Sequence, residues 1–337
     1  MNYNAQHGFA GSRAGPCIAL PYFAHSRGNS AAETRVTSCD GHAFVVRRTG
    51  HGAPILMLHD MAATQRAWDP VRDSLSCSNA VCTWDARGHG ESRRTPESAV
   101  PTLGLLAADL DAAITACAPE SAVLVGHGLG ALTILEFLRN YDAGRVSGVV
   151  LVDQTPRMLT APDWSLGLFG GFRAGDELEF EARIRAGFAE AWSSLQARET
   201  GPGGRTDAGM HARYGEPLHG LGGLAAGSML ALWRSMIGRD YRADLVALQI
   251  PLLVALGSGS NLYDAAQLGR WFQSFVPDAQ VIRYLKADHA PHVAAPERFA
   301  RDVAAFAARR EALVRSPEAV ASGAAGTPHL ASAQAAA

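Results

Sequence analysis

The chain has little charge imbalance and no long apolar run. Its 30 Lys and Arg residues and 32 Asp and Glu residues give a formal net charge of −2, so it lacks the basic surface that attracts nucleic acid or an anionic membrane. No apolar run approaches the roughly 18 residues that cross a bilayer. We therefore expect a small-molecule partner and no nucleic acid or membrane partner. The oligomeric state stays open.

Cysteines are few, and they form neither a CxxC pair nor a Cys/His group with the spacing of a zinc site. They are Cys17, Cys39, Cys77, Cys82 and Cys117. This odd, scattered set predicts no structural disulfides and no metal. The N-terminus also lacks a basic region followed by a continuous apolar stretch. We expect a cytoplasmic protein that needs no cofactor.

Seven short apolar runs recur along the central part of the 337 residues. Most are followed by a turn and a helical pattern, which is typical of a mostly parallel sheet flanked by helices. The runs are Phe44–Val46, Ile55–Leu58, Val81–Trp84, Ala122–Val125, Val149–Val152, Leu252–Leu256 and Val281–Leu285. The two ends, 1–33 and 316–337, are rich in small residues and show no sustained period, so we expect them to be disordered. The sequence thus predicts an α/β fold.

Helical patterns are clear at two places in this core and dominate one long segment outside it. One helical face carries Leu106, Leu110, Ala113, Ile114 and Cys117, and another carries Phe299, Val303 and Phe306. Between Met158 and Ala247 the strand rhythm stops, and aromatic, helix-forming stretches surround the Gly-rich segment 200–227. We expect a helical cap, 158–245, inserted into a core domain made of 34–157 and 246–315.

The stretch from Val123 to Ala131 has the pattern of a nucleophile elbow. A buried strand runs through a tight turn into a helix, and Gly126, Gly128 and Gly130 occupy the positions of G-x-S-x-G. In that motif the outer glycines let strand and helix approach closely, while the strained central residue projects its side chain above the sheet. A dinucleotide-binding fingerprint is the alternative, but it belongs in the first βαβ unit, and this motif follows several strands.

At this point the chain resembles the α/β-hydrolase superfamily, from about Thr34 to Arg310. The segment 54–60, Pro-Ile-Leu-Met-Leu-His-Asp, is similar to the strand and turn that supply one oxyanion-hole amide, here that of Met61; the amide of Leu129 would be the second. The segment 85–92 matches the family's structural D-x-R-G-x-G-x-S turn. His289 and the helix behind Pro296 resemble the loop and helix that carry the catalytic histidine.

The resemblance leaves two strand ends for the acid that orients His289. Ser260 stands at the usual aspartate position, and Asp264 is a poor second candidate. Asp153 follows the Val149–Val152 run directly, where a carboxylate is able to orient an imidazole. We predict that Asp153 lies within about 4 Å of His289, inside hydrogen-bonding reach.

Gly128 has no oxygen with which to attack a carbonyl, so a serine-type acyl-enzyme is excluded there. Three explanations stay open: an engineered replacement of Ser, an enzyme without a nucleophile, or a ligand-binding protein. The leading hypothesis is an enzyme for a small, largely apolar ester or related carbonyl compound, with His289 as base. Cofactor-free dioxygenases and lyases with a His–Asp dyad are the alternative that the resemblance suggests. On the leading hypothesis, Gly128→Ser is expected to create esterase activity.

The remaining candidates surround this predicted pocket. Asp60 stands where the family commonly has Gly, and the favoured interpretation has its side chain pointing outward to cap the following helix. His127 is expected to support the turn, and His292 to face the pocket without titrating. The full predicted substrate-binding set is His59, Asp60, His127, Phe169, Phe172, Trp233 and His292. Aromatic residues in a cap are typical of an apolar pocket.

Overall fold

The computed structural model describes residues 31–94, 100–188, 191 and 226–315. The ends that were expected to be disordered fall almost wholly outside these ranges. The exception is a correction: Ala32 and Glu33 belong to a strand and pair with Arg48 and Arg47. The sequence did not reveal this edge strand, because Val36 is the single buried residue in it and no apolar alternation exists to be read.

The fold is built on one eight-stranded sheet with the order β1-β2-β4-β3-β5-β6-β7-β8. The strands are β1 (Ala32–Thr37), β2 (Ala43–Thr49), β3 (Ala53–Leu58), β4 (Asn79–Thr83), β5 (Ala122–His127), β6 (Val146–Val152), β7 (Leu252–Gly257) and β8 (Gln280–Tyr284). The pairings of β1 with β2 and of β2 with β4 are antiparallel, and all the others are parallel. The predicted α/β fold with a mostly parallel sheet is confirmed.

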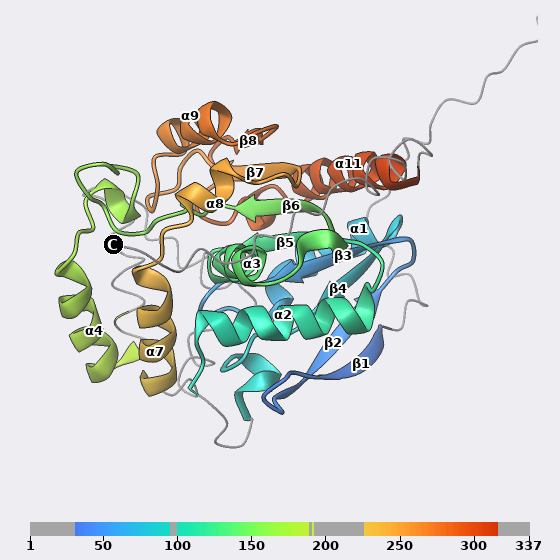
Figure 1. Ribbon diagram of the computed structural model, residues 1–337, viewed down its shortest axis with the longest axis horizontal. Coiled ribbons are helices and arrows are strands. Elements are labelled where there is room, and N and C mark those ends of the chain that lie inside the picture. Colours follow the sequence, from blue (N-terminus) through green and yellow to red (C-terminus); the bar gives the residue numbers. More distant parts are fainter. Residues whose placement is uncertain (1–30, 95–99, 189–190, 192–225, 316–337) are drawn as a thin grey trace, which may run out of the picture. The chain divides into compact units, whose positions relative to one another are not determined.

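Helices cover both faces of the sheet, which explains why its central strands read as continuous apolar runs. One face packs on α2 (Leu103–Cys117), α3 (Leu129–Asn140) and α9 (Ala265–Phe275). The other packs on α1 (Asp69–Ser76) and α11 (Pro296–Arg315), with the short α10 (Pro291–Ala294) before it (Figure 1). Alternate residues of the central strand β3 enter the two cores: Leu56 the first, Ile55 and Met57 the second. Both helical faces read from the sequence lie in α2 and α11, where they are buried.

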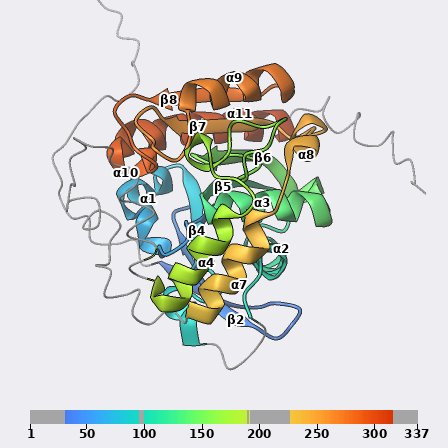
Figure 2. The ribbon, with the colours of Figure 1, turned by 90° about the vertical axis from the view of Figure 1, so that its left-hand side faces the viewer.

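The segment proposed as a cap contains a 3₁₀ turn at Leu168–Gly170 and the helices α4 (Asp176–Ala186), α7 (Ala226–Ile237) and α8 (Arg242–Val246). Helices α4 and α7 pack side by side beyond the carboxyl ends of the parallel strands (Figure 2). The Leu103 amide donates to Ser235 Oγ of α7 at 2.9 Å, which ties this segment to α2. Most of the Gly-rich stretch 200–227 lies outside the described residues.

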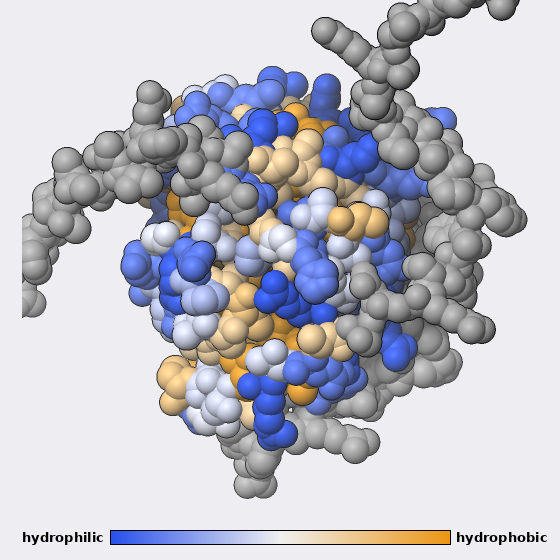
Figure 3. All heavy atoms as spheres, turned by 90° about the vertical axis from the view of Figure 1, so that its right-hand side faces the viewer, coloured by the Kyte–Doolittle hydropathy of each residue, from blue (hydrophilic) through white to orange (hydrophobic). Residues whose placement is uncertain are grey.

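The face that lies away from α4 and α7 mixes hydrophilic and hydrophobic side chains (Figure 3). Within the described ranges, no helix combines the length and the apolar character needed to cross a membrane. The four described cysteines are free thiols; Cys39 and Cys77 are exposed, while Cys82 and Cys117 are buried.

Candidate active site

The turn between β5 and α3 has the elbow geometry that its glycines predicted. A Cβ atom on Gly126 would lie 2.5 Å from the Ala131 nitrogen, and one on Gly130 would lie 2.3 Å from the Leu58 oxygen. Side chains at these two positions would therefore collide with backbone. Gly128 itself has φ 51° and ψ −111°, so the residue at the nucleophile position is in the left-handed half of the backbone map, where strain is common at active sites.

Asp60 does not point outward to cap a helix, so that interpretation was wrong. Its Oδ1 accepts a 2.8 Å hydrogen bond from the Leu129 amide, and its Oδ2 lies 3.3 Å from Nε2 of His289. A Cβ atom on Gly128 would lie only 1.8 Å from Asp60 Oδ1. The carboxylate therefore fills the space that an elbow side chain would occupy, and it uses one of the two amides expected to form the oxyanion hole. Met61 follows in the turn, with its side chain buried in the core.

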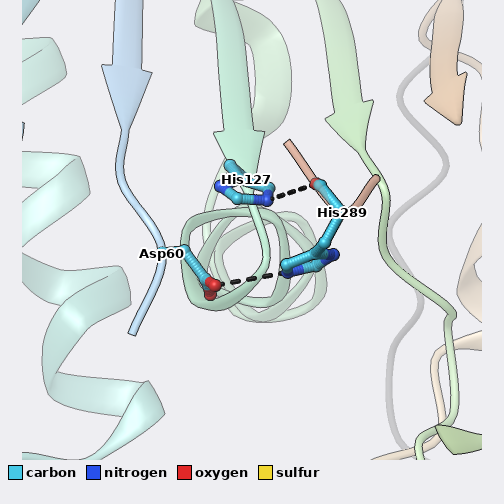
Figure 4. A group of neighbouring side chains, drawn as sticks. All are labelled: Asp60, His127 and His289. Atoms are coloured by element: carbon cyan, nitrogen blue, oxygen red, sulfur yellow. Dashed lines mark hydrogen bonds and ion pairs between the residues drawn. The ribbon is translucent and has the colours of Figure 1, made fainter. Parts of the chain in front are cut away.

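His289 lies between two carboxylates. Its Nδ1 is 2.9 Å from Asp153 Oδ2, so the predicted Asp153–His289 contact is present. Asp153 is held in turn by the Gly257 amide at 2.9 Å and by the Ser260 hydroxyl, which donates to Oδ2 at 2.6 Å. Figure 4 shows the Asp60 carboxylate and the His289 ring pointing toward each other. Asp60, Asp153 and His289 come from the turns after β3, β6 and β8. They lie at the carboxyl-end edge of the sheet, where ligands bind in such folds.

The Asp264 alternative for the acid fails. Its Oδ1 accepts from the amides of Ala266 and Gln267 and so caps the first turn of α9. Ser260, at the usual aspartate position, supports Asp153 instead of replacing it.

The two carboxylates favour a protonated His289. Burial by itself would lower the pKa of His289, but its hydrogen bonds to Asp153 and Asp60 outweigh burial and raise that pKa well above 6.5. Burial would raise the pKa of Asp60, but the hydrogen bond to His289, the positive charge of that ring and the Leu129 amide hold it well below its ordinary value. The pair is therefore a carboxylate facing an imidazolium. Neither Nε2 nor Oδ2 is free in this state.

Exposure separates the two carboxylates. The side chains of Asp60 and His289 keep 14% and 12% of their surface exposed, whereas Asp153 has none. The Asp60–His289 pair is thus in contact with solvent, while Asp153 lies fully buried on the other side of the ring.

The three histidines predicted to line the pocket make structural contacts. The His59 ring joins two turns, because its Nε2 accepts from the Ala86 amide at 2.9 Å and its Nδ1 donates to the Asp60 carbonyl at 2.7 Å. His127 donates through Nε2 to the His289 carbonyl at 2.8 Å, which agrees with its expected support of the turn. His292 is fully buried against Trp68, with ring centroids 4.4 Å apart, so the prediction that it faces the pocket was wrong.

The predicted cap aromatics form one chain of edge-to-face ring contacts. Phe169 contacts Phe172 at 6.5 Å, and Phe172 contacts Trp233 at 6.1 Å between centroids. The ring that lies nearer the site is one that the sequence did not single out: Tyr263, whose centroid is 6.4 Å from that of His289. The Phe169 amide donates to the Leu262 carbonyl at 2.8 Å, so this chain and the Tyr263 loop are joined. Tyr263 was missed because its loop follows β7 without a motif.

Asp60, His127 and His289 are of types that bind metals, and one ligand atom from each lies within 4.8 Å of the others. Most of their polar atoms are already paired, although Nδ1 of His127 has no hydrogen-bond partner among the described residues. Asp60 pairs with Nε2 of His289, and Nε2 of His127 is hydrogen-bonded to the His289 carbonyl. A cation would have to replace the proton on His289, so the arrangement suits proton transfer better than metal binding.

Comparison with known proteins gives consistent results. A family model for the alpha/beta hydrolase family matches residues 55–302. A 2-(acetamidomethylene)succinate hydrolase from Mesorhizobium japonicum is 30% identical over 264 residues, 75% of this chain and 87% of the relative. A pimeloyl-[acyl-carrier protein] methyl ester esterase from Aliivibrio salmonicida is 23% identical over 76% of this chain and 93% of the relative. The solved esterase EaEST from Exiguobacterium antarcticum superposes with a TM-score of 0.70 at 14% identity, covering 82% of this chain and 99% of that one.

Proposed function

Because the chain belongs to the alpha/beta hydrolase family, we propose that it hydrolyses a small, uncharged, largely apolar molecule and that Asp60, His289 and Asp153 are its functional side chains. The observation that carries this proposal is the position of Asp60. Its carboxylate lies where an elbow nucleophile would lie, against His289 and the Leu129 amide. The missing elbow side chain and the extra aspartate are then one arrangement, since each accommodates the other.

The charges around His289 support an uncharged substrate. Two carboxylates and one imidazolium leave a formal charge of −1 at the site, and like charges brought together at low dielectric repel strongly. A substrate that carries carboxylates, such as the succinate derivative named for the Mesorhizobium relative, would be placed against Asp60. The Tyr263 ring beside His289, and the partly buried Phe169 that is joined to its loop, favour an apolar body in the substrate, whereas Phe172 and Trp233 are buried in the core.

The same geometry weakens the dioxygenase or lyase alternative. A dyad that abstracts a proton needs a free Nε2 lone pair on the histidine, and here Nε2 faces Asp60 at 3.3 Å. The ester hypothesis also needs revision. An oxyanion from a substrate carbonyl would have to displace Asp60 from the Leu129 amide before it could bind there.

A panel of uncharged substrates tests the proposal: 4-nitrophenyl acetate, 4-nitrophenyl butyrate, γ-butyrolactone and styrene oxide, with 4-nitrophenyl succinate as the charged comparator. We expect turnover of at least one uncharged compound, a slower rate for the succinate, and a loss of about 10²–10⁴-fold in His289→Gln. The matched control is His51→Gln, at an exposed turn residue, which should keep the full rate. Binding of these compounds without any turnover would identify a ligand-binding protein and overturn the proposal.

A further inference from the structure

Building on the function proposed above, we propose that Asp60 is a nucleophile: its carboxylate, delivered from the turn after β3 instead of from the elbow, forms an ester with a saturated carbon whose leaving oxygen takes a proton from His289. The substrate class is a compound with such an electrophilic carbon, for example a strained cyclic ether.

The first support is steric. The ideal Cβ position of Gly128 lies 1.8 Å from Oδ1 and 2.3 Å from Cγ of Asp60. A carboxyl group therefore sits in the volume that an elbow side chain would fill. Carboxylates are able to act as nucleophiles that form covalent ester intermediates.

The second support is that the two carboxylate oxygens of Asp60 have different partners. The Leu129 amide holds Oδ1, and Oδ2 faces Nε2 of His289. In a hydrolytic triad the nucleophile contacts the imidazole, and backbone amides receive the oxyanion. Oδ2 thus takes the place of the attacking atom, while Oδ1 already lies at an oxyanion donor.

The occupied amide decides which electrophile fits. Attack on an ester carbonyl places a new oxyanion on the substrate, and that oxyanion would compete with Oδ1 for the Leu129 amide. Attack on a saturated carbon creates no such oxyanion. A tetrahedral intermediate then arises only afterwards, on the carboxyl group of Asp60, where Oδ1 is already held.

The protonation state lets both steps balance. In the first step Oδ2 of Asp60 gives an electron pair to the carbon, and the carbon–oxygen bond of the cyclic ether breaks. The ring oxygen keeps that bond's pair and takes the Nε2 proton of His289. The products are a hydroxyalkyl ester of Asp60 and a neutral imidazole.

In the second step neutral His289 takes one proton from water as the water oxygen attacks Cγ of Asp60. The Oδ1 oxyanion is stabilised by the Leu129 amide, and the bond from Cγ to the ester oxygen then breaks. The departing oxygen takes the second proton of that water. A diol leaves, and the carboxylate and imidazolium are restored, so the sum is cyclic ether plus water giving diol. Esterification also removes the charge that held the proton on Nε2, which makes His289 a base only when a base is needed.

The test follows oxygen atoms in the unmodified protein, with styrene oxide as the probe. A single turnover with enzyme in excess over styrene oxide is run in ¹⁸O-water, and the diol and the peptide that contains Asp60 are analysed by mass spectrometry. We expect one ¹⁸O in the Asp60 carboxylate and none in the diol, because the diol oxygen comes from the enzyme. The peptide that contains Asp153 should stay unlabelled, and peptide mapping separates any alkylation of the exposed thiols Cys39 and Cys77.

Two variants complete the test. Asp60→Asn should form no diol, whereas Asp264→Asn, which keeps a competent cap on α9, should react like the parent. An ¹⁸O atom in the diol with an unlabelled Asp60 would overturn the inference, because water would then attack directly. Lack of reaction with styrene oxide, together with His289-dependent hydrolysis of the esters, would overturn it and leave the proposed function standing. Failure of every panel compound would overturn both.

Discussion

Two groups of buried charges in this molecule are built in different ways. In the Arg87 cluster, the guanidinium donates to Asp109 through two nitrogens, at 3.0 and 2.6 Å, and also to Asp40. In the His289 site, a single imidazole lies between two carboxylates, and the contact with Asp60 is the longer, at 3.3 Å. The first group gives one cation a full set of acceptors in a rigid fork, as bidentate pairs do. The second shares one ring between two anions.

Accessibility follows the same division. Arg87 and Asp109 are 3% and 4% exposed, so nothing from outside reaches the centre of their pair. The side chains of Asp60 and His289, in contrast, are partly exposed to solvent. The Arg87 cluster belongs to the turn that the sequence predicted to be structural, and Asp85 of that turn accepts from the amides of Gln65 and Glu91. In the Arg87 cluster the buried guanidinium has a full set of acceptors, which is typical of a structural scaffold. In the His289 site two carboxylates share one imidazole and part of the pair is exposed, which is typical of a site that can react.

The largest expected effect comes from rebuilding the site. The structure corrects the expectation for Gly128→Ser alone, because the new side chain would meet the Asp60 carboxylate. The double change Asp60→Gly with Gly128→Ser should free the Leu129 amide and give His289 a hydroxyl to activate. We expect 4-nitrophenyl acetate hydrolysis to rise by at least about 10³-fold over the parent.

Gly128→Ser alone is the control for that experiment and should gain far less. A double variant with a native circular dichroism spectrum that forms no acyl-enzyme would contradict this prediction. In that case Asp60 would not be what separates this site from an ordinary esterase.

The Arg87 cluster should show its importance in stability. Arg87→Met leaves buried Asp109 without its partner, and breaking a buried pair in this way costs roughly 3–5 kcal/mol of unfolding free energy. Urea denaturation measures this loss. The matched control is Arg145→Met, because Arg145 pairs with Asp111 at a half-exposed position, where loss of an ion pair should cost less than about 1 kcal/mol. Equal losses in both variants would contradict a scaffold role for the cluster.

Acid should destabilise the buried histidines and the Arg87–Asp40 pair in different pH windows. Burial and the neighbouring His59 lower the pKa of His89 to about 4, and burial with the neighbouring His289 lowers that of His127 to about 3. Unfolded histidines bind protons first, so stability is complete above pH 6.5 and falls as the pH drops toward 4, by roughly 3 kcal/mol for His89. The hydrogen bond from Arg87 lowers the pKa of Asp40 to about 2, so its contribution is lost only between about pH 4 and 2.

Urea midpoints measured between pH 7 and 4 check this order. The His89→Gln variant should lose less stability than the parent over that range, because it has one fewer buried imidazole to protonate. A parent protein that is equally stable at pH 7 and 4 would show that His89 and His127 are not buried in the neutral form.

The smallest effect concerns the support behind Asp153. Ser260→Ala removes the 2.6 Å hydrogen bond to Asp153 Oδ2, and the loss of a bond to a charged group is worth about 1.5 kcal/mol, or roughly tenfold in rate. The panel assay measures it. Ser235→Ala, which loses a hydrogen bond to α2 far from Asp153, should lower stability without this change in rate. Similar rates in the two variants would show that Asp153 needs no such support.

The fold and most of the framework of the site could be predicted from the order of the amino acids. Continuous apolar runs placed the central strands, because strands covered on both faces must be apolar throughout. The two outer glycines of the elbow were readable because Gly126 and Gly130 each lie where a side chain would meet backbone. Asp153 could be chosen because a strand end fixes where its carboxylate lies.

The direction of the Asp60 side chain could not be predicted in this way, because it depends on contacts made by folding. A turn residue's local pattern permits several directions for its side chain, and the outward direction looked favourable as long as Gly128 was read as an empty position. The actual direction depends on three groups from distant parts of the chain: the Leu129 amide, the His289 ring and the space above Gly128. The same reason explains why Tyr263 was missed and why His292 was misplaced. Their partners are neighbours through folding, and no periodicity along the chain records them.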